Sequence, residues 1–362
     1  MDSQKNYYPA SESTGGWRYL NGANEIRDIA GMDPEKLERI EIFENRLCGG
    51  DSWSIVIIRH GYLVKEIHTF NVLHHTRFDI WSGTKSFTGT AWGLLLDDSS
   101  RGKLPGSKKV DIDSFAYDYL PEGYPLSDER KKNIRVRHLL SMTSGIPGEG
   151  SGVIGMPTAT GQGAFEHAFG FCPNRYGVWA NTLAAEPGSC WDYSDAGMCH
   201  LAVMFHNITG RDMADFMEER VFGPIGIENL SWDVQGGSGF LGPYTNAHTG
   251  IHISARELAR FGYLMLRKGY WRDKEIVPTQ WIDLATKSSQ DINRNYGYTW
   301  WVNTAGTNWP YLPKDAFALA GYRTNKCYVI PSLDLVVARV GSGPIDWHEE
   351  LFMRGIAGSI IS

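Results

Sequence analysis

The chain has 362 residues, of which 42% are hydrophobic and 12% aromatic, so it can bury a large core in one or two domains. Its formal net charge of -6 argues against a nucleic-acid partner. No apolar run reaches the ~20 residues that span a bilayer, and the N-terminus lacks the pattern of a secretory signal. We therefore expect a cytoplasmic protein without a membrane partner.

The five cysteines are odd in number and form no CxxC pair. This pattern predicts reduced, mostly buried thiols, with neither a disulfide framework nor a zinc site.

The first part of the chain predicts a helix and a hairpin. Residues 1 to about 30 are polar and rich in Gly and Ser, which predicts a loosely held lead-in. Asp33 followed by Pro34 is typical of a helix start, and the apolar residues that follow predict a helix over about 34–47. Residues 53–59 and 62–70 are β-rich and flank His60-Gly61, which predicts an antiparallel hairpin.

The sequence after residue 70 predicts a mainly helical middle segment, followed by further strands near the C-terminus. Residues from about 85 to 235 have mainly helical patterning, broken by loops containing Gly and Pro. Further elements are predicted as helices over 212–221, 254–268 and about 346–360, and as strands over 298–302, 327–330 and 335–340. We therefore predict an α/β (α+β) fold. Residues 1–80 and 236–362 would form an α/β domain with an antiparallel sheet flanked by helices, and residues 81–235 an inserted, mainly helical domain.

Ser82-Gly-Thr-Lys85 opens an apolar stretch over 87–96. If a helix begins there, Lys85 lies one turn beyond Ser82 on the same face. A serine hydroxyl needs a base within hydrogen-bond reach to become a nucleophile. A lysine serves as that base only if its pKa falls well below the usual ~10.4. The helix N-terminus would also offer the Ser82 backbone N–H to an oxyanion.

The SxxK pattern is weak by itself. Ser100-Arg-Gly-Lys103 matches it equally well, although it is predicted to lie in a polar loop over 97–106. Without further context, Ser82 could equally be a helix N-cap and Lys85 a solvated side chain.

Three later segments supply that context. They are His138-Leu-Leu-Ser-Met-Thr-Ser-Gly-Ile146, Pro187-Gly-Ser-Cys-Trp-Asp-Tyr193-Ser-Asp195, and the stretch from Thr249 to Gly262. In this order, from about residue 50 to 343, the chain resembles the serine β-lactamase-like and penicillin-binding-protein-like superfamily. The resemblance is to the group that contains the class C β-lactamases, the family VIII esterases and the aminohexanoate-oligomer hydrolases. It implies a β-lactamase-like fold with the active site between its two parts.

The resemblance also implies roles for two residues of the second motif. Tyr193 would face Ser82 and Lys85 across the cleft and relay protons. Asp195 takes the place where the family often has Asn, and it would hold Lys85 by a charge-assisted hydrogen bond. Taken alone, Tyr193 could be a packing residue and Asp195 a surface carboxylate.

A third motif departs from the family pattern. Leu319-Ala320-Gly321 stands where relatives that bind penicillins commonly carry Lys-Thr-Gly or His-x-Gly. By resemblance, Gly321 allows the substrate close to the backbone, and the Tyr322 backbone N–H is the second oxyanion donor. The missing cation counts against efficient β-lactamase or D,D-peptidase action and favours the esterase and aminohexanoate-oligomer hydrolase branches. Further candidates for substrate binding are Leu319, Ala320, Arg323 as a replacement charge, and Tyr322, Trp300 and Trp301 as walls of an acyl pocket.

These observations predict a serine hydrolase that cleaves a small-molecule ester or amide through a Ser82 acyl-enzyme, of the carboxylesterase or amidase type. A β-lactamase or D-stereospecific peptidase, an acyltransferase and a non-catalytic binding protein are the alternatives. No cofactor or metal is expected, because His248-Thr-Gly-Ile-His252 lacks the glutamate of HExxH. The sequence predicts neither the substrate nor the oligomeric state.

Overall fold

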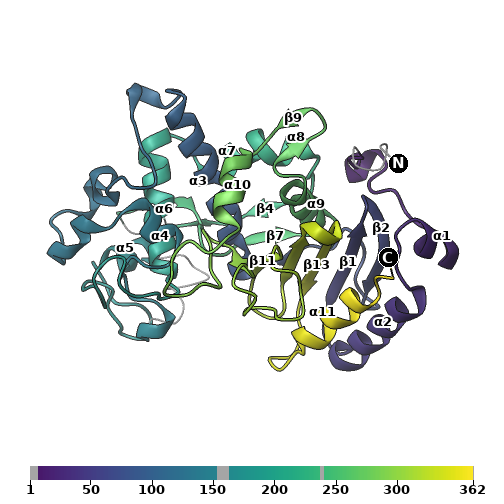
Figure 1. The fold of residues 1–362 in the computed structure, drawn as a ribbon. Helices are drawn as coiled ribbons and strands as arrows, with labels where there is room; N and C mark the ends of the chain where they lie inside the picture. The colour runs from purple at the N-terminus through teal and green to yellow at the C-terminus, as the bar shows by residue number, and fades with distance from the viewer. Residues whose placement is uncertain (1–6, 153–162, 237–239, 362) are drawn as a thin grey trace.

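A six-stranded antiparallel sheet forms the centre of one part of the molecule (Figure 1). The computed structural model describes residues 7–152, 163–236 and 240–361. The strand order is β10-β11-β12-β13-β1-β2. These strands are β1 (Trp53–Arg59), β2 (Tyr62–His68), β10 (Trp301–Val302), β11 (Phe317–Ala320), β12 (Lys326–Ile330) and β13 (Leu335–Gly341). The predicted hairpin is β1–β2, and β13 pairs with the other edge of β1, so segments from both ends of the chain share one sheet.

Both faces of the sheet are apolar, because alternate residues of its central strands point to opposite sides. In β1, Ile55 and Ile57 face a cluster with α2 (Pro34–Cys48) and α11 (Glu349–Gly358). Val56 and Ile58 face the other cluster, which includes α9 (Ala255–Leu266). The sheet is thus covered by helices on both faces, which confirms the predicted fold class.

The chain between β2 and α9 is mainly helical (Figure 1). Its α-helices are α3 (Thr84–Ser100), α4 (Val136–Leu140), α5 (Ala164–Phe169), α6 (Asp195–Thr209), α7 (Met213–Met217) and α8 (Gly223–Ile225). Short strands accompany them: β3 (Phe78–Asp79), β4 (Ser231–Trp232) and β7 (Ile251–Ile253) form one sheet, and β5 (Val234–Gln235) pairs with β6 (Tyr244–Thr245). The exact domain boundaries, at 80–81 and 235–236, stay a prediction.

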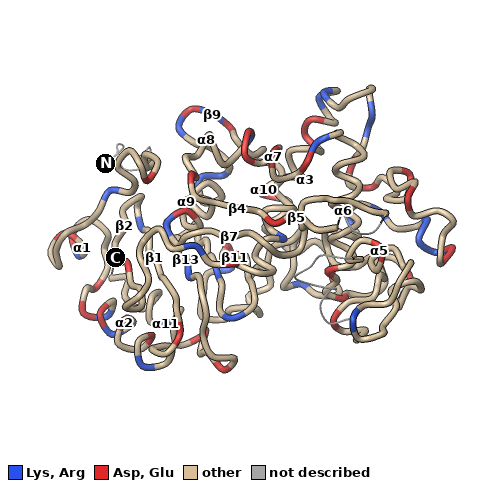
Figure 2. Tube along the Cα trace, turned by 180° about the vertical axis from the view of Figure 1, so that it is seen from behind, with Lys and Arg blue, Asp and Glu red and all other residues tan. Residues whose placement is uncertain are grey.

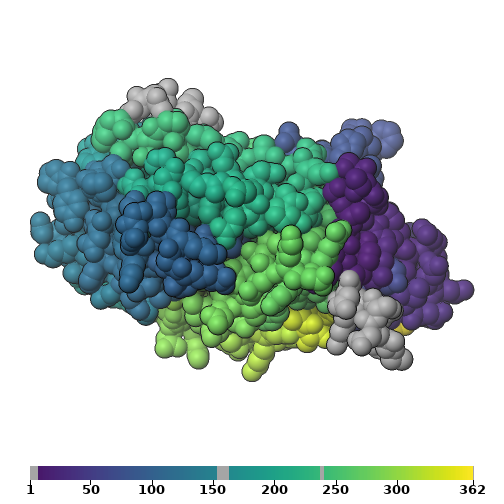
Figure 3. All heavy atoms as spheres, turned by 90° about the horizontal axis from the view of Figure 1, so that it is seen from above, coloured from purple at the N-terminus to yellow at the C-terminus, as the bar shows by residue number. Residues whose placement is uncertain are grey.

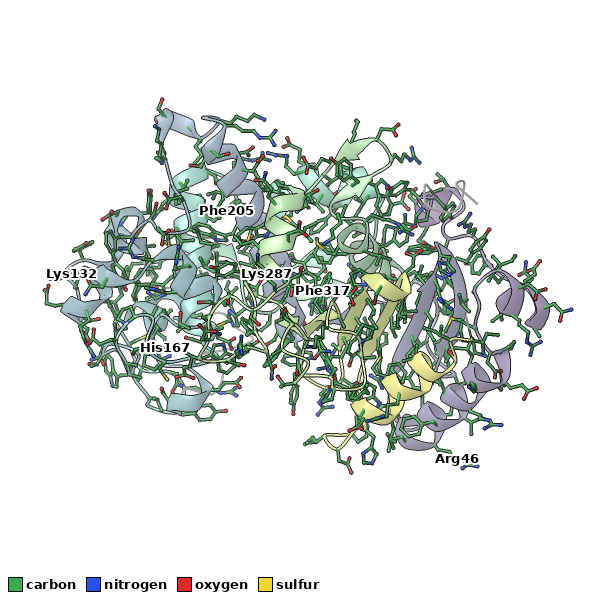
Figure 4. All side chains as sticks on the ribbon, in the orientation of Figure 1. Arg46, Lys132, His167, Phe205, Lys287 and Phe317 are labelled. Carbon is green, nitrogen blue, oxygen red and sulfur yellow. The ribbon has the colours of Figure 1, made fainter. Side chains whose placement is uncertain are left out.

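The first motif, Ser82 to Lys85, runs into the start of helix α3, which is buried along most of its length. It packs against α6 and α7, and also against α10 (Thr279–Ala285). Figure 4 shows Phe205 of α6 in the helical part and Phe317 of β11 in the sheet part. Because α3 has neighbours on all sides, the residues at its N-terminus are held firmly in place.

Many charged residues lie in the outer parts of the molecule, although Lys85, Arg260 and Arg339 are buried. Figure 2 shows acidic and basic residues interspersed along the outer parts of the trace. In the view from above, the purple N-terminal segment lies at the opposite end of the molecule from the dark blue segment at the left (Figure 3). In the part of the chain that the structure describes, no helix has both the length and the apolar character that a membrane span requires.

For residues 7 to about 30, the prediction of a loosely held lead-in is wrong, whereas residues 1–6 lie outside the described residues. Trp17 is buried at 1% exposure, and Tyr19 forms a parallel bridge with Leu63. The guanidinium of Arg260 donates to the carbonyls of Pro9 and Ala10. A short helix α1 (Ala23–Asp28) follows. The polar composition of this segment predicted little burial. The burial of Trp17 nevertheless holds the segment against the core.

Three further predicted elements also differ from the structure. The strand expected over 298–302 is only Trp301–Val302, because Thr299 has a φ of 64° and its N–H donates to Leu140 in the helical part. The loop expected over 97–106 begins later than predicted, since α3 continues to Ser100. The helix expected over 212–221 is α7 followed by a π-helical turn, Glu218–Phe222.

Candidate active site

The entry into α3 is fixed by bonds to the short sheet beside it. Strand β3 pairs with β7, and the Ile80 N–H donates to the Ile251 carbonyl over 2.9 Å. The Asp79 carboxylate then accepts the Trp81 N–H at 2.7 Å. Trp81 adopts a φ of 50°, so the chain turns sharply there into a 3₁₀ turn, Trp81–Gly83. Ser82 lies in this turn, directly before α3, as the SxxK motif predicts.

Lys85 lies one turn beyond Ser82 and is buried at 1% exposure. Its Nζ donates to Ser82 Oγ over 2.8 Å and to the His248 carbonyl over 3.1 Å. The third neighbour is Asp195 Oδ1, at 2.7 Å. Two of these contacts are hydrogen bonds and the third is an ion pair, and together they suit an ammonium group.

Asp195 determines the charge of Lys85. Burial lowers the pKa of Lys85, but the negative charges of Asp195 and Tyr193 outweigh burial and raise it above its usual value. Burial raises the pKa of the Asp195 carboxyl, and the Lys85 ammonium reverses this effect and leaves the pKa lowered. The position of Asp195 in the first turn of α6 also favours its negative charge. At rest, the two residues therefore form a buried ion pair.

Tyr193 completes the group around Ser82. Lys85 Nζ lies 4.7 Å from the centroid of its ring, and Ser82 and Lys85 are close enough to the phenol to lower its pKa. Burial raises the pKa of Tyr193, and the opposing effect of Lys85 does not cancel this rise. The ring stacks on Trp301, with a centroid distance of 6.2 Å and an interplanar angle of 26°. The three predicted catalytic side chains thus meet at one point.

The backbone of the third motif, at Gly321, packs directly against the turn that holds Ser82 of the first motif. A Cβ at Gly321 would lie 1.8 Å from the Ile80 carbonyl oxygen, so only glycine allows the end of β11 to lie this close to the turn that holds Ser82. The Gly321 N–H donates to the Asn325 carbonyl at 2.8 Å. In the part of the chain that the structure describes, the Tyr322 backbone N–H has no hydrogen-bond partner. It is therefore free to donate to a substrate oxygen.

A cavity of about 720 Å³ opens over Ser82. Of the predicted residues, its lining includes Ser82, Tyr193, Ala320, Gly321, Tyr322 and Trp301. Leu319 and Trp300 are buried at 0% and 1% exposure instead, and Trp300 stacks on Phe261 in the core. Neither residue lines the cavity, and their role in substrate binding stays a prediction. Arg323 is exposed and outside the lining, with its guanidinium 5.8 Å from the Tyr322 ring.

Several cavity residues escaped the sequence analysis. They are Glu149, Gly150, Trp191, Asp192, Asn308, Trp309, Pro310, Tyr311, Lys326, Glu349 and Glu350. Trp191 and Asp192 adjoin Tyr193 in the second motif, and that position could have drawn attention to them. Residues 308–311 belong to a loop without any motif. The contribution of His248 was also missed, because it comes from a backbone carbonyl and not from the imidazole.

The fold and the site together define a β-lactamase-like protein with a serine, a lysine and a tyrosine at its centre. The sequence matches the β-lactamase family over residues 53–346, so the chain belongs to that family.

Solved structures of the same fold include three that span most of this chain. A putative 6-aminohexanoate-dimer hydrolase from Bacillus anthracis is 17% identical, with a TM-score of 0.67 over 98% of this chain and 88% of that one. A putative β-lactamase from Bacteroides dorei is 14% identical, with a TM-score of 0.70 over 91% and 100% of the two chains. EstCE1, a hydrolase with promiscuous acyltransferase activity, is 15% identical, with a TM-score of 0.68 over 93% and 100%.

Two curated proteins are similar in sequence. An uncharacterised protein of Alkalihalophilus pseudofirmus is 28% identical over 175 residues, which are 42% of this chain and 52% of that protein. An unguisins hydrolase of Aspergillus campestris is 23% identical over 305 residues, which are 75% of this chain and 49% of that protein. The chain thus spans about half the length of the curated relatives it matches.

Proposed function

We propose that this protein is a serine hydrolase that cleaves an ester or amide through an acyl-enzyme on Ser82, of the carboxylesterase or amidase type. The observation that carries the proposal is the contact of Ser82 Oγ with Lys85 Nζ at 2.8 Å, inside a cavity that a small molecule can enter. A surface serine that only capped a helix would have no buried lysine and tyrosine beside it.

Tyr193 is the group that takes the serine proton in this proposal. The reactive form is the one in which the Lys85–Tyr193 pair has lost one proton. Asp195 raises the pKa of Lys85, so the lysine stays an ammonium and the phenolate of Tyr193 is the base. Lys85 then stabilises the phenolate and holds Ser82 Oγ in position.

Acylation follows by addition and elimination. Ser82 Oγ bonds to the substrate carbonyl carbon as its proton passes to Tyr193, and the carbonyl electrons move onto the oxygen. The backbone N–H groups of Ser82 and Tyr322 stabilise this oxyanion, each contributing roughly 10²–10³ in rate. The bond to the leaving group then breaks, and Tyr193 returns the proton to the departing oxygen or nitrogen.

Deacylation repeats these steps with water. The water attacks the acyl carbon and gives a proton to Tyr193, and Ser82 Oγ leaves with that proton. An alcohol or amine that takes the place of water would give acyl transfer. This second outcome is favoured only by the likeness to EstCE1.

A turnover assay tests the proposed function. We expect short-chain p-nitrophenyl esters to be hydrolysed faster than a chromogenic cephalosporin, since Leu319-Ala320-Gly321 offers no cation for a β-lactam carboxylate. Ser82→Ala is expected to lose at least about 10³ in kcat. Ser100→Ala alters the other SxxK match, at the far end of α3, and serves as the matched control. Equal turnover by the Ser82→Ala variant and the parent would contradict the proposal.

A further inference from the structure

Among the residues that the structure describes, the cavity over Ser82 is lined by more negative than positive side chains. Four carboxylates, from Glu149, Asp192, Glu349 and Glu350, face it together with one cation, Lys326. Such a lining would repel a substrate anion near the nucleophile and attract a cation. Whether each charge is available to a substrate depends on the partners that it already has.

Three of the four carboxylates are engaged by the protein. Asp192 accepts the N–H groups of Gly148 and Gly150, at 2.9 and 2.8 Å, and also the hydroxyl of Ser151. Glu350 pairs with Arg354 at 2.6 Å.

Glu349 neutralises the cation of the lining. Its Oε2 lies 3.2 Å from Lys326 Nζ, and its Oε1 accepts from Trp309 and Tyr328, at 2.8 and 2.5 Å. Lys326 is therefore a poor replacement for the cation that the third motif lacks.

Glu149 differs from these residues. Its backbone N–H donates to the Tyr193 carbonyl at 2.9 Å, which fixes it beside the catalytic tyrosine. In the described part of the chain, its carboxylate has neither a hydrogen-bond donor nor an ion-pair partner. Glu149 is an exposed residue, and partial desolvation together with the charges of Asp195 and Asp192 raises the pKa of its carboxyl, whereas Lys85 lowers it. An unpaired carboxylate in this position gains from any cation that enters the cavity.

The remaining walls also suit a cation. Trp191, Tyr193 and Trp301 line the cavity beside Glu149, and their rings lie within 6.2 Å of one another. Trp309 and Tyr311 line it as well. Aromatic faces attract ammonium groups, most strongly those that are weakly hydrated. One unpaired carboxylate among aromatic rings is a suitable site for an alkylammonium group.

We infer that the substrate of this enzyme is an ester or amide that carries an ammonium group, and that Glu149 is the residue that binds this group. The inference rests on the proposed serine-hydrolase function and names the substrate class of the same site. It places the positive charge within the cavity while the carbonyl carbon lies against Ser82.

Pairs of esters that differ only in charge test this inference. On the acyl side, the p-nitrophenyl ester of 4-(trimethylammonio)butanoate is compared with its neutral isostere, p-nitrophenyl 5,5-dimethylhexanoate. On the leaving-group side, butyrylcholine is compared with 3,3-dimethylbutyl butyrate. We expect kcat/KM to favour the cationic member of at least one pair by about tenfold. The preference should weaken as ionic strength rises.

Glu149→Gln is the decisive variant, because it removes the charge and keeps the shape. The cationic-to-neutral ratio of kcat/KM should fall about tenfold in this variant. Glu129→Gln changes the net charge equally at an exposed residue outside the cavity, and it should leave the ratio unchanged. Equal rates for both members of both pairs, or a ratio that Glu149→Gln does not change, would overturn the inference.

A binding measurement separates this inference from the proposed function. In Ser82→Ala, the trimethylammonio ester should quench tryptophan fluorescence at lower concentration than its neutral isostere, and Glu149→Gln should remove the difference. If this binding preference is present but no ester acylates the parent protein, the hydrolase function fails and the cation site stands. If neither ester binds preferentially, the cation site fails whatever the activity.

Discussion

At the residue scale, the 2.7 Å contact between Asp195 and Lys85 is the feature that sets the chemistry of the site. A neutral asparagine at this position could bind the lysine but could not hold it as a cation. In the proposed mechanism, the carboxylate keeps Lys85 positively charged beside Tyr193, so the tyrosine would carry the proton transfers. The same carboxylate raises the pKa of Tyr193, which makes a phenolate harder to form.

Asp195→Asn should therefore move the pH dependence of the reaction. Asp195 raises the pKa of Lys85 and that of Tyr193, so its removal lowers both. The rising limb of kcat/KM against pH, which reports loss of a proton from this pair, is expected to shift towards lower pH. Measured profiles for the parent and the Asn variant check this, and a shift towards higher pH would contradict it.

Tyr193→Phe tests the base directly. The variant keeps the ring that stacks on Trp301 and loses only the hydroxyl. We expect kcat to fall by about 10²–10⁴, with little change in thermal stability, since general acid–base catalysis contributes that much. Unchanged kcat in a folded Phe variant would show that another group moves the proton.

The sequence predicted the side chains of this site better than its backbone groups. Ser82, Lys85 and Tyr193 belong to motifs whose spacing is visible in the chain. The His248 carbonyl that binds Lys85 is a group that every residue has, so no pattern reveals it. Glu149 lies in a loop, and only the fold brings it to the cavity. Trp300 and Trp301 are adjacent, and only the fold decides that Trp301 lines the cavity while Trp300 is buried.

At the element scale, the site depends on the contact between β11 and the turn before α3. Elements with strong local signals were predicted closely. For α2, Asp33 caps the helix through the N–H groups of Glu35 and Lys36, and the predicted and observed ends differ by one residue. The strand expected over 298–302 was wrong because the left-handed backbone of Thr299 follows from tertiary bonds, and threonine does not ordinarily favour it.

Gly321→Ala should break this contact between elements. The added methyl group would lie 1.8 Å from the Ile80 carbonyl oxygen, so the end of β11 must move away from Ser82. We expect a stability loss of about 1–3 kcal/mol and at least about 10²-fold lower kcat, because the Tyr322 N–H moves from the oxyanion. Gly50→Ala is the control, since a Cβ there meets nothing within 4 Å. Full activity in Gly321→Ala would contradict the assigned oxyanion donor.

At the scale of the whole molecule, buried histidines link folding to pH. Burial lowers the pKa of His200 to about 3, and that of His138 and of His248 to about 4. His200 is fully buried: its Nδ1 bonds the Ala196 carbonyl at 2.8 Å, and its Nε2 bonds the Tyr117 hydroxyl at 3.0 Å. The ring also stacks on Phe169, with a centroid distance of 4.3 Å. These contacts suit the neutral imidazole, which donates at Nδ1 and accepts at Nε2.

The folded protein should therefore lose stability in acid. The contribution of a histidine with a lowered pKa is fully present above its unfolded pKa of about 6.5 and declines as pH falls towards the folded value. For His200, the free energy of unfolding should fall by up to about 1.4 kcal/mol per pH unit below about pH 6.5.

Urea denaturation between pH 7.5 and 5 measures this decline. The free energy of unfolding should depend less steeply on pH in His200→Gln than in the parent. His206→Gln changes an exposed histidine on the same helix, and it should show the same slope of unfolding free energy against pH as the parent. If the unfolding free energy has the same slope against pH in His200→Gln and in the parent, His200 does not cause the loss of stability in acid.

The central claim is that Ser82 is acylated during turnover, and intact-protein mass spectrometry after exposure to a p-nitrophenyl ester tests it most directly. The account predicts one added acyl group on the parent protein and on Ser100→Ala, located by peptide mapping to Ser82, and no adduct on Ser82→Ala. An adduct that persists in Ser82→Ala, or that maps to another residue while turnover continues, would contradict it.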